Sequence, residues 1–162
     1  MTLPRPIVAA DHAALLALNN AHAVELSAEE PGRFGRILAA AAFSAAIGRE
    51  GDPEGFLLAF DDRTPVQGPN HAWFLARHGR FLYVDRVCVA ARARRRGLAG
   101  ALYQAAFAAA RARGAAWVCC EINTEPDNPA SDAFHDALGF VEVGRRFLED
   151  RGKAVRYLER AP

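Results

Sequence analysis

Apolar residues recur every three or four positions in two stretches near the start of the chain. In residues 7–26 the side chains of Leu15 and Leu18 share one helical face, and in residues 31–48 Phe34 begins a similar face. This period is typical of amphipathic helices. The pattern therefore predicts two helices, over residues 7–26 and 31–48.

The period changes in the next stretch of the chain. A continuous apolar run at residues 55–60 predicts a buried strand, and residues 64–70 form a loop rich in Pro and Gly. Residues 72–77 and 81–89 predict two further strands, joined by a tight turn at His78-Gly79-Arg80. We expect these three strands to be antiparallel neighbours.

The second half of the chain alternates helices and strands. An alanine-rich helix is predicted over residues 97–113 and an apolar strand over residues 116–122, so the strands on either side of this helix form a parallel crossover. A short helix follows, with Asn128 at its N-cap and Gly139 just past its end. Two terminal strands are predicted at residues 140–147 and 154–158.

Composition narrows the class of protein. The 162 residues are 51% hydrophobic and 24% charged, which is typical of one globular domain, here residues 1–162, of the α/β or α+β class. The formal charge is +1, so the balance of charge favours neither nucleic acid nor an anionic membrane as a partner. The longest apolar stretch, residues 37–47, is about half of a membrane span. We expect a cytoplasmic protein without a signal segment.

Cysteine and histidine residues give no metal signature. Cys88, Cys119 and Cys120 lie in apolar runs, where reduced core thiols are expected. Neither a Cys-x-x-Cys pair nor zinc-like His/Cys spacing accompanies them, so we expect no metal site. His71 and His78 are interpreted as surface residues.

The most informative motif is Arg94-Arg95-Arg96-Gly97-Leu98-Ala99-Gly100, which lies between an apolar strand and the alanine-rich helix. The first turn of a helix has unpaired backbone N–H groups and the positive end of the helix dipole. Gly97 allows the backbone to approach a ligand closely, and the arginines add forked donors suited to phosphate oxygens. The motif therefore predicts a site for a diphosphate group.

Two segments resemble the GNAT N-acetyltransferase family. The arginine motif is similar to the family's Arg/Gln-x-x-Gly-x-Gly/Ala signature, and Asn128-Pro129-Ala130-Ser131 followed by Phe134-His135-Asp136-Ala137-Leu138-Gly139-Phe140 is similar to its later segment. The resemblance implies a three-layer fold with a central mixed, mostly antiparallel sheet flanked by about four helices. It also implies acetyl-CoA as co-substrate and a small-molecule or peptide amine as acceptor. A homodimer is compatible with it.

The resemblance further assigns cofactor contacts. Backbone groups at Val87 and Val89 would face the pantetheine arm and the thioester, and Asn128 and Ser131 would contact the same arm. The arginine motif would hold the pyrophosphate. Ordinary core packing and helix capping remain open explanations for these residues.

Direct acetyl transfer needs a base for the amine and an acid for the thiolate. Glu121 and Asp85 lie in apolar strand runs, where an ionised carboxylate needs a partner or a function, so both are candidate bases. Strand alternation is expected to bring them together and to direct Arg86 to the opposite face. His135 stands where many relatives have a tyrosine and is the candidate acid. Ion pairs and a hydrogen-bonded core histidine are the structural alternatives.

Two other functions remain as alternatives. A non-catalytic acyl-CoA-binding protein is suggested by His135 in place of tyrosine, and the arginine cluster allows a phosphate- or nucleic-acid-binding module. The charge of +1 and the lack of a second basic cluster argue against the latter.

Overall fold

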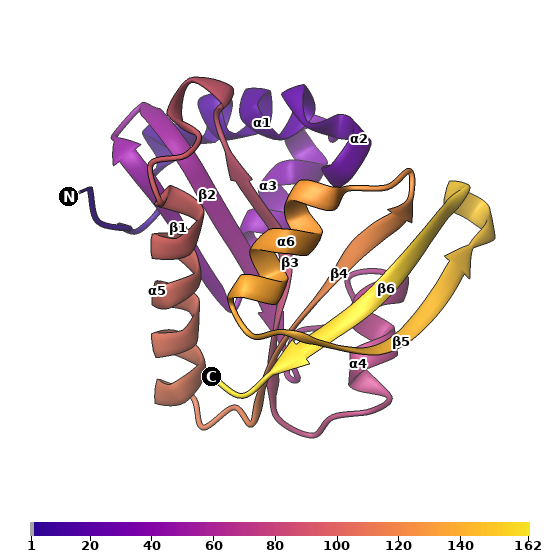
Figure 1. Ribbon diagram of the computed structural model, residues 1–162. Coiled ribbons are helices and arrows are strands. Elements are labelled where there is room, and N and C mark those ends of the chain that lie inside the picture. The colour runs from indigo at the N-terminus through magenta and orange to yellow at the C-terminus, as the bar shows by residue number, and fades with distance from the viewer. Residues whose placement is uncertain (1) are drawn as a thin grey trace.

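The computed structural model describes residues 2–162 as a six-stranded sheet between helices (Figure 1). The strand order is β1-β2-β3-β4-β6-β5, and every neighbouring pair is antiparallel except β3 and β4. This confirms the predicted fold class. The strands are β1 (Phe43–Arg49), β2 (Asp52–Asp61), β3 (Phe81–Val89), β4 (Trp117–Glu125), β5 (Val141–Leu148) and β6 (Lys153–Arg160).

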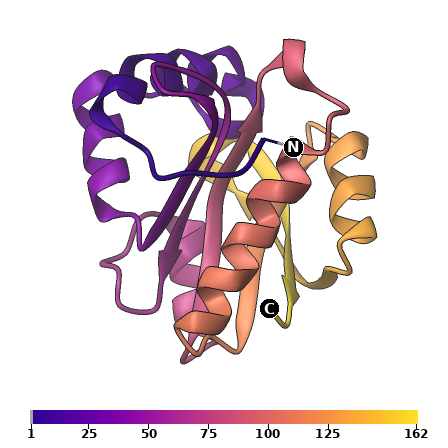
Figure 2. The same cartoon turned by 90° about the vertical axis from the view of Figure 1, so that its left-hand side faces the viewer.

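Helices cover both faces of the sheet, as the quarter-turn view in Figure 2 shows. On one face α5 and α6 enclose a core that includes Leu102 and Phe107. On the other face α1, α3 and α4 enclose a second core that includes Leu15, Phe34 and Phe74. The helices are α1 (His12–Ala21), α2 (Ala23–Leu26), α3 (Pro31–Ala40), α4 (Pro69–Leu75), α5 (Leu98–Ala112) and α6 (Pro129–Ala137). In residues 2–162, none is long and apolar enough to cross a bilayer.

The predicted helix over residues 31–48 is wrong beyond Ala40. The chain turns to extended backbone at Ala41, and Phe43–Arg49 forms the edge strand β1. Alanine is the best helix former, but this preference is worth less than about 1 kcal/mol per residue, and pairing with β2 overrides it by burying Ala46 and Ile47 completely. The first predicted helix, over residues 7–26, is also divided, because α1 ends at Ala21 and α2 is a separate short turn.

The strand predicted over residues 72–77 is wrong, because this segment belongs to α4. Pro69 occupies the first turn after Gly68, a position that suits proline. Trp73 stacks on Tyr157 of β6 with ring centroids 4.1 Å apart, so the aromatic residues serve a helix that packs against the sheet. The three antiparallel neighbours are therefore β1, β2 and β3.

His71 is buried inside the α4 layer, contrary to the surface position expected for it. Only 1% of it is exposed. Its Nδ1 accepts a hydrogen bond from the Gln67 N–H, and its Nε2–H donates to the Asp61 carbonyl. Both ring nitrogens are paired, so this histidine fixes the loop before α4.

Candidate active site

Strands β3 and β4 are parallel neighbours over only three residue pairs, which end at Tyr83 and Cys119. Beyond that point the strands diverge, as Figure 1 shows. The divergence opens a cleft of about 370 Å³. Its lining includes seven of the residues singled out from the sequence: Asp85, Val87, Arg94, Glu121, Asn128, Ser131 and His135. Val89 lies at the end of β3, half-buried against the α5 core.

The turn before α5 has the backbone geometry of an anion site. Arg95 and Gly97 have φ values of 60° and 75°, and α5 begins directly afterwards. The first helical bond runs from the Ala101 N–H to the Gly97 carbonyl. The N–H groups of Leu98, Ala99 and Gly100 therefore have no partner inside the helix. No heavy atom lies within 4 Å of a Cβ built at Gly97 or Gly100, so the turn is open.

The three arginines of the turn have different surroundings. Arg96 forms an exposed ion pair with Glu54 of β2 at 2.7 Å. Arg94 donates to Nε2 of His22 at 3.0 Å and lines the cleft, so it connects the turn to the end of α1. Arg95 is exposed. Since exposed ion pairs are weak, the Arg96 pair does not prevent its guanidinium from meeting a phosphate.

His135 lies on α6 and is buried, with 4% exposed. Its Nδ1 lies 2.8 Å from the Ser131 carbonyl, which can only accept, so Nδ1 carries the proton. Burial lowers the pKa of His135, so the ring is neutral. Its Nε2 therefore accepts from the Tyr103 hydroxyl at 2.7 Å. Asn128 caps the same helix by accepting from the Ser131 N–H.

Tyr103 is a site residue that the sequence did not reveal. In the sequence it is one aromatic residue within the alanine-rich helix predicted over residues 97–113. In the structure its side chain is fully buried, yet it lines the cleft beside His135. Burial raises the pKa of the phenol, which keeps its proton at neutral pH. Its only sequence signal is a hydroxyl on an otherwise apolar helix face.

Glu121 on β4 accepts a hydrogen bond from the Tyr83 hydroxyl at 2.6 Å. Burial, assisted by the nearby charge of Asp85, raises the pKa of Glu121 to about 7. The hydrogen bond from Tyr83 opposes this rise. A carboxyl group with this pKa is half ionised near neutral pH and can both take up and release a proton.

Asp85 lies at a β-bulge. Leu58 of β2 pairs with Arg86 and Ala59 pairs with Val84, so Asp85 is left out of the ladder. The bulge breaks strand alternation, and the expectation that Arg86 points away from Asp85 is wrong. Arg86 Nε lies 2.7 Å from the Asp85 carboxylate.

A second, larger cavity of about 760 Å³ lies on the α3 and α4 side of the sheet. It extends from α3 and the loop before α4 to the β5–β6 hairpin. Asp85, Arg86 and Glu121 line both this cavity and the cleft. The two candidate bases therefore lie at the boundary between the cleft and the larger cavity, where they can contact a molecule bound in either.

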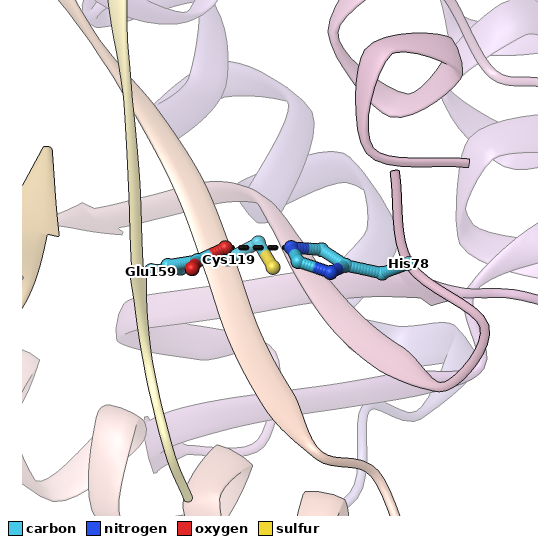
Figure 3. Close-up of side chains that lie close together, drawn as sticks. All are labelled: His78, Cys119 and Glu159. Atoms are coloured by element: carbon cyan, nitrogen blue, oxygen red, sulfur yellow. Dashed lines mark hydrogen bonds and ion pairs between the residues drawn. The ribbon is translucent and has the colours of Figure 1, made fainter. Parts of the chain in front are cut away.

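Cys88 and Cys120 lie in the wall of the cleft. All three cysteines are buried and free, which confirms the core-thiol interpretation. Figure 3 shows Cys119 beside His78 and Glu159, with the three potential ligand atoms within 4.8 Å of one another. His78 Nε2 already lies 2.6 Å from the Glu159 carboxylate, and burial raises the pKa of the thiol. The cluster thus joins β6 to the segment after α4, and half-buried His78 is not the surface residue expected.

Comparison with protein families matches residues 16–140 to the acetyltransferase (GNAT) family. The chain belongs to this family, and membership indicates an acyltransferase. The resemblance seen in its two motifs is confirmed. A search of curated proteins finds no match.

Solved structures with the same fold include several acetyltransferases. A ribosomal-protein-alanine N-acetyltransferase from Brucella melitensis is 25% identical, with a TM-score of 0.74 and 99% of both chains covered. The ribosomal-protein-S18-alanine N-acetyltransferase from Escherichia coli is 16% identical, with a TM-score of 0.72 and 99% of this chain and 94% of that chain covered. NAA60 from Arabidopsis thaliana, solved with acetyl-CoA, is 15% identical, with a TM-score of 0.75 and coverage of 99% and 98%.

Proposed function

We propose that this protein transfers an acetyl group from acetyl-CoA directly to a primary amine. The observation that carries the proposal is the junction of two cavities at Glu121, a carboxyl group with a pKa of about 7. Acetyl-CoA occupies the cleft between β3 and β4, and the amine enters from the larger cavity. Both family membership and a structural relative solved with acetyl-CoA support this arrangement.

The turn before α5 holds the pyrophosphate. The N–H groups of Leu98, Ala99 and Gly100 donate to its oxygens, and Arg94, Arg95 and Arg96 supply positive charge. The open space beside Gly97 lets the phosphates approach the backbone. The pantetheine arm runs along the edge of β3 at Val87 and Val89, with Asn128 and Ser131 on the opposite wall.

Glu121 acts as the general base. Its carboxylate removes a proton from the substrate ammonium, and the free amine attacks the thioester carbonyl. Burial, with a smaller contribution from the negative charge of Asp85, keeps the pKa of Glu121 high enough for this transfer, and Arg86 holds Asp85 in an ion pair. The new C–N bond forms, the C–S bond breaks, and the nitrogen loses its second proton, which replaces the proton taken up by the departing thiolate.

His135 and Tyr103 act together at the leaving group. They share one proton between Nε2 and the phenolic oxygen, and this pair supplies a proton to the departing thiolate. His135 alone has no proton to give from Nε2, because its proton is on Nδ1. The acid predicted from the sequence is therefore better assigned to the pair.

Two measurements on the purified protein test the proposed function. Calorimetry measures the binding of acetyl-CoA, CoA and pantetheine, and thiol release with mass detection of the product measures turnover over a panel of primary amines. We expect both CoA forms to bind and acetylated amine to form. Binding without turnover would favour the non-catalytic alternative, and absence of binding would contradict the proposal.

A Tyr83→Phe variant is expected to shift the pH dependence of turnover upward. The hydroxyl stabilises the ionised form of Glu121, so its loss raises the pKa of that carboxyl above about 7. Turnover at pH 7 then falls several-fold and recovers toward pH 8.5. The measurement is kcat against pH with saturating substrates. An unchanged midpoint would show that this carboxyl group does not control the rate.

A further inference from the structure

Charge is segregated along the larger cavity. Carboxylates outnumber cations where the cavity joins the cleft, and cations outnumber carboxylates in the part away from the junction. The carboxylates at the junction are Glu25, Asp85 and Glu121. One cation, Arg86, also lies there, paired with Asp85. Away from the junction the only carboxylate lining the cavity is Glu29, against the cations Arg33, Arg36, Arg151 and Lys153. The cavity thus has a negative inner end and a positive outer part.

Three of the four outer cations have no acidic partner within the described residues 2–162. Arg33 pairs with Glu29 at 3.1 Å. Within residues 2–162, no carboxylate oxygen lies within the 4.0 Å ion-pair limit of Arg36, Arg151 or Lys153. Lys153 Nζ donates to the Val24 carbonyl at 2.9 Å, a contact that leaves its charge uncompensated. These three cations are therefore available to an external anion.

The three cations come from two regions far apart in sequence, α3 and the β5–β6 hairpin. Arg36 lies on α3 and is exposed, Arg151 lies in the β5–β6 hairpin and is exposed, and Lys153 begins β6 half-buried. The side chain of Arg151 lies 3.6 Å from a Cβ built at Gly68, which places it over the loop before α4. The fold has brought these charges to the walls of one cavity.

We infer that the acceptor is a primary amine that also carries a carboxylate, with the carboxylate held by Arg36, Arg151 and Lys153 and the amine directed to Glu121. This inference rests on the proposed function, because it names the substrate class of the same site. Forked guanidinium donors suit a carboxylate, and the junction carboxylates attract an ammonium group. The reversed orientation brings like charges together at both ends, so the charge pattern also sets direction.

The cavity volume suits such a molecule. A space of about 760 Å³ accommodates a small organic molecule or the first residues of a peptide. The shared chemistry is an amine and a carboxylate on one molecule. The two sources, a small amino acid and an acidic peptide, are separated by the substrates of the test.

The test compares acceptors that differ only in charge. The peptide amides are Ala-Asp-Asp-Ala, Ala-Asn-Asn-Ala and Ala-Arg-Arg-Ala, and the small acceptors are 4-aminobutanoate and its amide. Thiol release with saturating acetyl-CoA gives kcat/KM for each. We expect the carboxylate-bearing member of at least one series to exceed its neutral partner about tenfold, mostly through KM, with the difference decreasing as salt is added.

A double variant, Arg36→Gln with Arg151→Gln, tests the residues assigned. We expect the ratio of acidic to neutral acceptors to fall close to one. Arg111→Gln is the matched control, because Arg111 is exposed in the last turn of α5 and lines neither cavity. It is expected to keep the preference. Equal rates for charged and neutral acceptors, or a preference that survives the double variant, would overturn the inference.

Failure of the proposed function is distinguishable from failure of this inference. If no acceptor is turned over, the proposed function fails, and calorimetry of the same acceptors with CoA-loaded protein then decides the inference. About tenfold tighter binding of a carboxylate-bearing acceptor than of its neutral partner supports the inference that the cavity holds a carboxylate. Equal binding, or no binding, overturns it.

Discussion

Replacing Glu121 with glutamine is expected to lower kcat about 100- to 10,000-fold, the usual contribution of a general base. In the parent protein the rate should rise with pH up to about 7, the pKa of Glu121, because only the ionised carboxylate accepts the proton. In the Glu121→Gln variant this rise should disappear. The measurement is kcat from pH 5.5 to 9 with saturating acetyl-CoA and amine.

The stability of the same variant provides the control for folding. Burial raises the folded-state pKa of Glu121 above its ordinary value of 4.5, so its contribution to stability is full below pH 4.5 and is lost as pH rises through about 7. Glutamine does not ionise and can still accept from Tyr83. At pH 8 the variant should therefore be at least as stable as the parent in urea unfolding. A slow variant that is also unfolded would not support the assignment to Glu121.

A Gly97→Glu variant is expected to weaken acetyl-CoA binding about 100-fold, which corresponds to about 2.7 kcal/mol. The new side chain occupies the open space beside the first turn of α5, where the pyrophosphate is proposed to lie. Its negative charge repels the phosphates and competes for the helix N–H groups. Calorimetric titration with acetyl-CoA measures the change.

Gly51→Glu is the matched control for this variant. Gly51 and Gly97 share a φ of 75°, so both substitutions impose the same left-handed strain and add the same charge. Gly51 lies in the turn between β1 and β2 and, unlike Gly97, does not precede a helix N-terminus. The two variants should show similar losses in melting temperature, but only Gly97→Glu should lose affinity. Equal affinity losses would remove the special role of the α5 turn.

The sequence correctly predicted the elements in which the local residue pattern and the tertiary packing favour the same secondary structure. Strand β3 has the predicted bounds, and α5 begins one residue after Gly97, because apolar runs and glycine act locally. Strand β1 was missed because its alanines carry little strand preference, and only pairing with β2 decides its structure. Helix α4 was missed because Trp73 and Phe74 in a short apolar run are equally compatible with a strand.

The candidate site was predictable in part for the same reason. Alternation was expected to bring Glu121 and Asp85 together, and both line the cleft and the larger cavity. The expected position of Arg86 was wrong, because a bulge depends on the partner strand and leaves no mark in the sequence. The contact between Tyr103 and His135 joins residues 32 positions apart on two helices, and no local pattern predicts such a pair.

The gap between β3 and β4 also couples ligand binding to stability. Where the two strands have parted, their facing edges lack each other's ladder bonds. Edges of this kind present backbone donors and acceptors to whatever enters between them. An extended molecule that bonds to both edges serves as a substitute strand and joins the halves of the sheet. As ligand fills the cleft, the free energy of unfolding rises, by about 2.7 kcal/mol when the ligand is present at a hundred times its Kd.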